Sequence, residues 1–146
     1  MAQRSLVLIL ARDLADKLAT AMFVVDQEGT LVYFNEAAAD ILGESFGEAG
    51  RMRVEAWSTA FRPVHEGGEE ITPEDLPLVI ALRRRVPAHR DMKIRGLDGE
   101  VRDIAVTAFP LFARADEFVG AAAIFWQLGG PSGAGSIGLP TEIGGG

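Results

Sequence analysis

The chain has 146 residues, no cysteine and a net charge of −7. This length supports one domain that folds without disulfide bonds or a structural metal. The lack of cysteine excludes thiol nucleophiles and thiolate metal sites, and it fits the reducing cytoplasm, where we expect the protein. The negative charge repels phosphate backbones, so we expect no nucleic-acid partner. No apolar segment has the length of a membrane span, so we expect no membrane partner.

Residues 1–19 predict an amphipathic helix. Its charged residues fall opposite an apolar arc formed by leucines at a spacing of four: Leu6, Leu10, Leu14 and Leu18. Leu8 and Ile9 lie outside this arc, so the helix has more apolar surface than one contact face requires. We therefore predict that the four leucines form a dimerisation face. A surface helix with some surplus apolar residues is the alternative.

The segment that follows encodes a strand, a tight turn, a second strand and a capped helix. Asp26 can accept hydrogen bonds from backbone amides of the turn, and Gly29 supplies a positive φ. The second strand, Leu31 to Phe34, pairs back on the first. Asn35 is a typical helix N-cap, and Gly43 lies where a left-handed residue would end that helix.

Residues 44–71 have weak periodicity and predict short helical turns and loops, with Trp57 and Phe61 as isolated apolar anchors. A longer helix is expected from Leu76 to Leu82, with Pro77 in its first turn. Three arginines at its C-terminal end, residues 83–85, complement the helix dipole.

Three strands, residues 89–97, 101–112 and 118–128, predict an antiparallel meander. The last strand is apolar on both faces, so both faces need a cover. We expect the small helices on one face and the N-terminal helix on the other, from the same chain or from a second copy. The glycine-rich residues 129–146 predict a flexible tail.

This order of elements, together with Asp26-x-x-Gly29 and the motif from Asn35 to Gly43, resembles a PAS sensor domain from about Leu18 to Gln127. The resemblance implies an α+β fold, with a PAS-like five-stranded antiparallel sheet, small helices on one face and an amphipathic N-terminal helix. The expected organisation is a dimerisation helix over residues 1–19, a PAS domain over 20–128 and a tail over 129–146. The Gln127-Leu128-Gly129-Gly130 end departs from the junction through which many relatives connect to an output domain.

By the same resemblance, the protein is expected to be a homodimeric signal-transduction module that relays its state through the N-terminal helix to a downstream signalling protein. An internal cavity would bind a small apolar or aromatic ligand. The residues expected to line it are Phe34, Ile41, Leu76, Val79, Ile80, Phe109 and Phe125. A constitutive dimerisation scaffold without a ligand is the alternative.

The cofactor is not identified by the residues, and haem and flavin are both disfavoured. Some PAS domains bind haem iron through a histidine on or near the long helix, but there is none between Pro73 and Arg85, and His65 and His89 are expected at the surface. Flavin photochemistry of the adduct-forming type needs a cysteine. No histidine or acidic spacing matches a metal motif, and no serine or threonine stands near a patterned base, so we expect neither a metal site nor catalysis.

Overall fold

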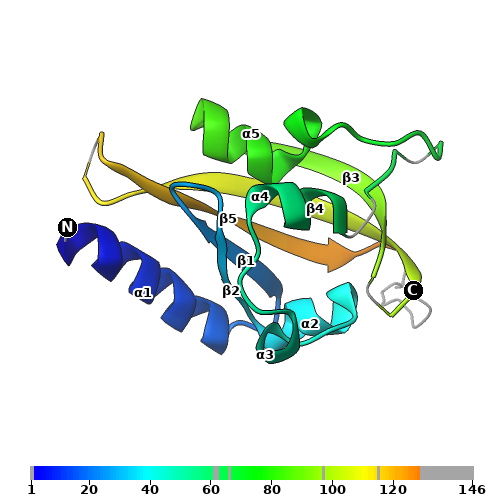
Figure 1. Ribbon diagram of the computed structural model, residues 1–146, viewed down its shortest axis with the longest axis horizontal. Helices are drawn as coiled ribbons and strands as arrows, with labels where there is room; N and C mark the ends of the chain where they lie inside the picture. The colour runs from blue at the N-terminus through cyan, green and yellow to red at the C-terminus, as the bar shows by residue number, and fades with distance from the viewer. Residues whose placement is uncertain (1, 61–62, 66, 97, 115, 129–146) are drawn as a thin grey trace, which may run out of the picture.

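The computed structural model describes residues 2–60, 63–65, 67–96, 98–114 and 116–128. The predicted tail, residues 129–146, and the predicted anchor Phe61 lie outside them. The elements follow the expected order (Figure 1). They are α1 (Ala2–Lys17), β1 (Ala21–Asp26), β2 (Leu31–Phe34), α2 (Glu36–Leu42), α3 (Phe46–Ala49), α4 (Val54–Ala60), the 3-10 turn η1 (Pro73–Asp75), α5 (Pro77–Arg84), β3 (Ala88–Arg95), β4 (Val101–Phe112) and β5 (Phe118–Gln127).

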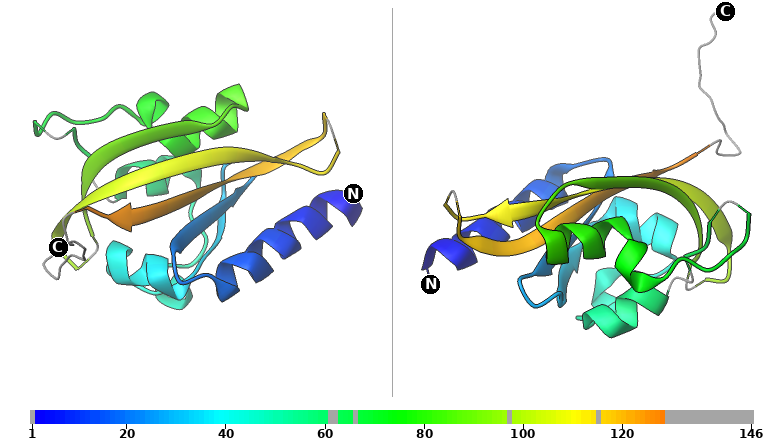
Figure 2. Two further views of the ribbon diagram at one scale, coloured as in Figure 1. Left: turned by 180° about the vertical axis from the view of Figure 1, so that it is seen from behind. Right: turned by 90° about the horizontal axis from the view of Figure 1, so that it is seen from above.

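The five strands form one antiparallel sheet in the order β2-β1-β5-β4-β3. Helices α2, α4 and α5 pack on one face of the sheet, and α1 packs on the other (Figures 1 and 2). We call these the helix face and the α1 face. The predicted α+β architecture is therefore confirmed.

The strand register settles which side chains of β5 point to which face. Ala121, Ala123 and Phe125 belong to the core beneath the helices, whereas Ala122 packs under α1. Gly120 lies where β5 passes close to β1, and a Cβ atom there would be 2.3 Å from the carbonyl oxygen of Val25. Small residues in β5 therefore allow both faces of this central strand to be covered closely.

The N-terminal helix that covers the second face belongs to the same chain. Ala11 and Ala15 of α1 are buried against Met22 and Val24 of β1 and against Ala122. Two small side chains at a spacing of four let the helix backbone approach the sheet closely. In this structure of a single chain, the cover on the second face is therefore the chain's own α1.

The turn residue of the first hairpin and the two capping residues of α2 make the contacts that the sequence predicts. The Asp26 carboxylate accepts hydrogen bonds from the amides of Glu28 (2.9 Å) and Thr30 (3.0 Å). Asn35 caps α2, its side-chain oxygen accepting from the Ala38 amide at 3.0 Å. Gly43 ends α2 in the left-handed conformation with φ +89°.

Candidate functional site

An apolar cavity of about 80 Å³ lies between the helix face of the sheet and helices α4 and α5. Strands β1, β3, β4 and β5 contribute residues to its wall, whereas β2 does not. The cavity is lined by Phe23, Leu42, Trp57, Ser58, Pro63, Leu76, Pro77, Leu78, Met92, Ile94, Ile104, Val106, Ala123 and Phe125. None of these residues is charged, so the described wall favours a neutral occupant.

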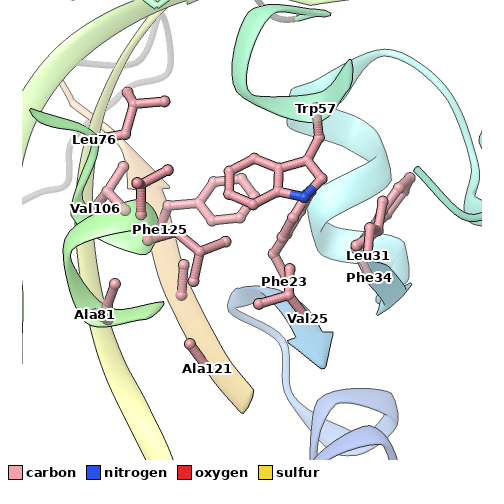
Figure 3. Packing of buried hydrophobic residues seen from close by; sticks show 14 of the residues in the cluster. Phe23, Val25, Leu31, Phe34, Trp57, Leu76, Ala81, Val106, Ala121 and Phe125 are labelled. Atoms are coloured by element: carbon pink, nitrogen blue, oxygen red, sulfur yellow. The ribbon is translucent and has the colours of Figure 1, made fainter. Parts of the chain in front are cut away.

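Trp57 is the aromatic residue that α4 contributes to the wall of this cavity. Its indole ring points from α4 toward β5 and lies close to Phe23 and Phe125 (Figure 3). The Phe23 and Trp57 rings meet edge to face with their centroids 5.6 Å apart, a favourable arrangement for two aromatic rings. The indole N–H donates to the backbone carbonyl of Gly29 at 2.7 Å, so the polar edge of the ring is already satisfied.

The residues predicted to line the cavity separate into four groups, of which Phe109 is the last. Leu76 and Phe125 line it, and Phe34, Ile41 and Val79 are buried in the same core without reaching it. Ile80 is only partly buried and lies outside this core.

Phe109 is the clear error among these predictions. In β4 the side chains of Ile104, Val106 and Ala108 point to the helix face, which turns Phe109 to the α1 face. There it pairs with Ala122 of β5 and packs in the cluster beneath α1. The strand is apolar on both sides over this stretch, so the sequence pattern does not distinguish the two faces.

Several lining residues escaped the sequence prediction. The sequence predicts Trp57 only as an isolated anchor, and it does not place Ser58 at this cavity. The buried residues of α4 are Val54, Trp57 and Ser58, whose spacing of three and four is that of one helix face. That spacing was the available signal, but the flanking segment has too little periodicity to make it stand out.

A second feature, the buried side chain of Asn35, joins α1 to the elements that wall the cavity. Its oxygen accepts from the amides of Met22 and Ala38, both at 3.0 Å. Its NH₂ group donates to the carbonyl oxygens of Ala15 (2.8 Å) and Thr20 (2.9 Å). The side chain is thus fully hydrogen-bonded, and the residue is only 3% exposed. One amide group therefore connects α1, the loop after it, β1 and α2.

A polar cluster next to Asn35 adds a second link between α1 and the sheet. The Tyr33 hydroxyl on β2 donates to the Asp16 carboxylate on α1, and the Arg12 guanidinium lies 4.8 Å from the centre of the Tyr33 ring. Burial and the hydrogen bond to Asp16 raise the pKa of Tyr33 to about 12. The neutral, donating form of Tyr33 is therefore the one that the fold favours.

The described residues do not fit a haem or a flavin in this cavity. Neither histidine lines it. The His65 Nδ1 atom lies 3.3 Å from a guanidinium nitrogen of Arg90, and the His89 Nε2 atom lies 3.5 Å from the Asp91 carboxylate. The cavity has about half the volume of the roughly 150 Å³ apolar cavity that accepts benzene. A haem or an isoalloxazine ring is larger than benzene, so neither enters with the walls in this arrangement.

Two further kinds of site are absent from the described part of the chain. It contains no cluster of three or more histidine, aspartate or glutamate side chains suited to a metal ion. None of its helices combines the length and the apolar character needed to cross a lipid bilayer.

Comparison with known proteins identifies the type of domain that this architecture is similar to. Residues 10–79 match the family model described as PAS domain. The PAS domain of a Colwellia psychrerythraea protein is 18% identical with a TM-score of 0.59, over 84% of this chain and 97% of that one. The PAS domain of nitrogen regulation protein NR(II) from Vibrio parahaemolyticus is 15% identical with a TM-score of 0.56, over 82% and 98%.

A LOV protein from Rhodobacter sphaeroides has the same fold as well. It is 18% identical with a TM-score of 0.65, over 91% of this chain and 71% of that one. At these identities, the solved structures establish the fold. No curated protein sequence matches the chain.

Proposed function

We propose that this chain, which carries a PAS domain, is a dimeric sensory module that holds a small apolar ligand in its cavity and relays occupancy through α1 to a downstream signalling protein. The observation that carries the proposal is the set of four hydrogen bonds of Asn35. They tie the helix on one face of the sheet to elements that wall the cavity on the other.

The relay follows the elements in contact with the ligand site. Phe23 of β1 and Leu42 of α2 both line the cavity. Asn35 bonds the residue next to Phe23 in β1 and the first turn of α2, and it also holds the C-terminal end of α1. A ligand that favours one position of β1 or α2 would thus favour one position of α1, provided that its affinity differs between the two arrangements.

The dimer is supported by the apolar surface that α1 leaves uncovered. In the described part of the chain, the exposed large apolar residues on α1 are Leu6 (52%), Ile9 (54%), Leu10 (56%) and Leu14 (53%). Leu18, the fourth residue of the predicted dimerisation face, packs partly against the sheet of its own chain. A stripe of leucines at a spacing of four on a helix already anchored by its opposite side is suited to packing against a second copy.

The oligomeric state tests this part of the proposal. We expect the full chain to be a dimer by size-exclusion chromatography with light scattering and the double variant Leu10→Lys with Leu14→Lys to be a monomer. Val86→Lys is the matched control, because Val86 is also an exposed apolar residue but follows α5. Circular dichroism would verify that all three proteins are folded. A double variant that remains dimeric, or a full chain that is monomeric, would contradict the proposal.

A constitutive dimerisation scaffold is the second candidate, and the tight interior favours it. Phe23 and Phe34 stack with ring centroids 6.0 Å apart, and Phe46 meets Phe34 edge to face at 5.5 Å. These aromatic rings fill the core next to α2, which leaves the small cavity beside Trp57.

Native mass spectrometry together with an absorption spectrum of the freshly purified protein separates the two candidates. A bound small molecule, or a dimer whose α1 resonances shift when a small apolar compound is added, supports sensing. A Soret band or a blue-region flavin band would contradict the ligand class that we propose. A dimer that gives no resonance shift at the cavity or at α1 with any apolar compound supports the scaffold.

A further inference from the structure

We propose that the C-terminal end of α5 and the β4–β5 hairpin form a docking surface for an acidic segment of a partner protein, with the Arg85 guanidinium group as its carboxylate-binding group. The surface consists of Arg83, Arg84, Arg85, Phe112 and Phe118, and we call it the arginine–phenylalanine surface. None of these residues lines the cavity or belongs to the leucine stripe of α1. The inference therefore depends neither on the ligand nor on the dimer.

Two aromatic rings hold the guanidinium group of Arg85 in place. Its carbon atom lies 4.5 Å from the centre of the Phe118 ring, within the range of a cation–π contact. The Phe112 ring meets the Phe118 ring edge to face, with the centroids 5.9 Å apart, and Phe112 is 38% exposed. Helix α5 ends on the side of the molecule where the β4–β5 hairpin turns (Figures 1 and 2). A fixed guanidinium group thus lies beside an exposed apolar ring.

The backbone of Arg85 indicates that this side chain does more than end the helix. Arg85 is the C-cap of α5 and has the left-handed conformation, with φ +61° and ψ +38°. Every other described residue with a positive φ is a glycine, the residue that adopts such a conformation without steric cost. At position 85 the chain has a long charged side chain instead, and this side chain is the one placed over Phe118.

The Arg85 guanidinium group has no carboxylate partner in the described part of the chain. Residues 83–85 are exposed, and none of them forms an ion pair with another described residue. Arg83 and Arg84 lie in the last turn of α5, where their charges complement the helix dipole. Arg85 follows this turn, and a guanidinium group that stacks by its face keeps its N–H edges free. Those edges match the two oxygens of a carboxylate.

The charge distribution restricts the partner to a short acidic segment. A membrane surface or a nucleic acid is negative over a long distance, so it would also approach the carboxylates that give the chain its net charge of −7. A segment of a few residues contacts the arginines alone, since charges farther away than about 8 Å are screened at physiological ionic strength. An apolar side chain within this segment would pack on Phe112. The chemical class is therefore an acidic peptide segment that contains an apolar residue.

Fluorescence anisotropy with the full chain tests this surface. The probe is a labelled peptide of sequence Glu-Glu-Leu-Glu-Glu, and its two controls have Gln or Lys in place of every Glu. Arg85→Gln removes the charge, and Arg85→Lys keeps the charge without the planar group. Arg51→Gln is the matched control, because Arg51 is also exposed but lies in the loop between α3 and α4. Phosphatidylglycerol vesicles are the membrane probe, measured by co-sedimentation.

We expect the wild type to bind the glutamate peptide in preference to the glutamine and lysine peptides. The dissociation constant should rise about tenfold in Arg85→Gln and in Arg85→Lys, the scale of one hydrogen bond to a charged group, and stay unchanged in Arg51→Gln. Failure of the wild type to bind the glutamate peptide, or unchanged binding in Arg85→Gln, would overturn the proposal. Tighter binding of the wild type to the vesicles than to the peptide would overturn it in favour of a membrane.

The variant Arg85→Gly separates the proposed role from a purely structural one. Glycine adopts the left-handed conformation without steric cost but lacks the side chain. This variant should therefore unfold at a urea concentration no lower than the wild type and lose affinity for the glutamate peptide as Arg85→Gln does. A loss of stability together with unchanged affinity would show that Arg85 serves only to end α5, and it would overturn the inference.

Discussion

Replacing Asn35 by aspartate separates the two halves of its hydrogen-bond set. The introduced carboxylate can still accept from the amides of Met22 and Ala38, and aspartate is as good an N-cap as asparagine. It cannot donate to the carbonyl oxygens of Ala15 and Thr20, which it would face at 2.8–2.9 Å. The variant thus keeps the cap of α2 and breaks the link to α1.

The size of the effect follows from these contacts. Two neutral hydrogen bonds are lost at about 1 kcal/mol each, and the carboxylate repels the two carbonyl oxygens that remain. We expect Asn35→Asp to lower the free energy of unfolding by about 3 kcal/mol, a large part of the 5–15 kcal/mol typical of a domain. Asn35→Ala should cost more, because it also removes the acceptor for the α2 amide.

Amide hydrogen exchange followed by NMR measures the link directly. In Asn35→Asp, exchange of the α1 amides should accelerate by more than the change in global stability explains, while the Ala38 amide stays protected. Ser45→Ala is the control, because Ser45 caps α3 through its own capping box and makes no hydrogen bond to the described residues of α1. It should cost about 1 kcal/mol and leave the exchange of α1 unchanged.

The pH dependence gives an independent check on the same variant. The folded state should raise the pKa of the introduced carboxyl group, because its protonated form can donate to one of the two carbonyl oxygens. The variant should therefore recover stability relative to the wild type as the pH falls and lose it again as the pH rises through the raised pKa. Protection of α1 that equals the wild type at neutral pH would refute the proposed link.

Two further predictions concern single positions. The chain has one tyrosine, so its near-ultraviolet absorbance should report the pKa of about 12 at Tyr33. Between pH 10 and 12 the wild type should lose stability relative to Tyr33→Phe, because the Tyr33 hydroxyl loses its proton at a lower pH in the unfolded state than in the folded state. Gly43→Ala should destabilise the fold by about 2–4 kcal/mol in urea unfolding, and Gly99→Ala by about 1–2 kcal/mol. Both glycines have a positive φ, +89° and +87°, but only at Gly43 would the new Cβ atom collide with the backbone, 2.6 Å from the Asp98 amide nitrogen. Equal losses of stability in the two variants would contradict this reasoning.

The features that could be predicted from the sequence are those that depend on near neighbours. Asp26 and Gly43 act through contacts within four residues, so a turn or a helix end identifies them. The bonds from Asn35 to Ala15 and Thr20 span 20 and 15 residues, and they exist only because α1 packs on the sheet beside it. A capping residue was predictable, whereas its link to a second helix was not.

The interior of the cavity was harder to predict because apolar residues occupy both faces of the central strands. Phe109 and Phe125 are equivalent by composition, and only the pairing of β4 with β5 places them on opposite faces. The burial of Ser58 was hard to predict because the residue is polar. A serine in a segment of weak periodicity suggests a surface position, and its burial depends on the neighbouring Trp57 packing against Phe23.

Helix α1 carries the two surfaces that the proposed function requires, the one packed on the sheet and the exposed leucine stripe. The helix lies against the sheet through Ala11 and Ala15, whose small side chains fix a close distance and turn the leucine stripe outward. If the leucines had packed on the sheet, the helix would be rotated and no apolar stripe would remain for a partner. Because Asn35 holds the carbonyl of Ala15, a displacement of α2 or β1 acts on the residue that sets this contact. Under the proposed function, a small movement of α2 or β1 at the cavity would therefore change how the leucine stripe is presented to a second copy.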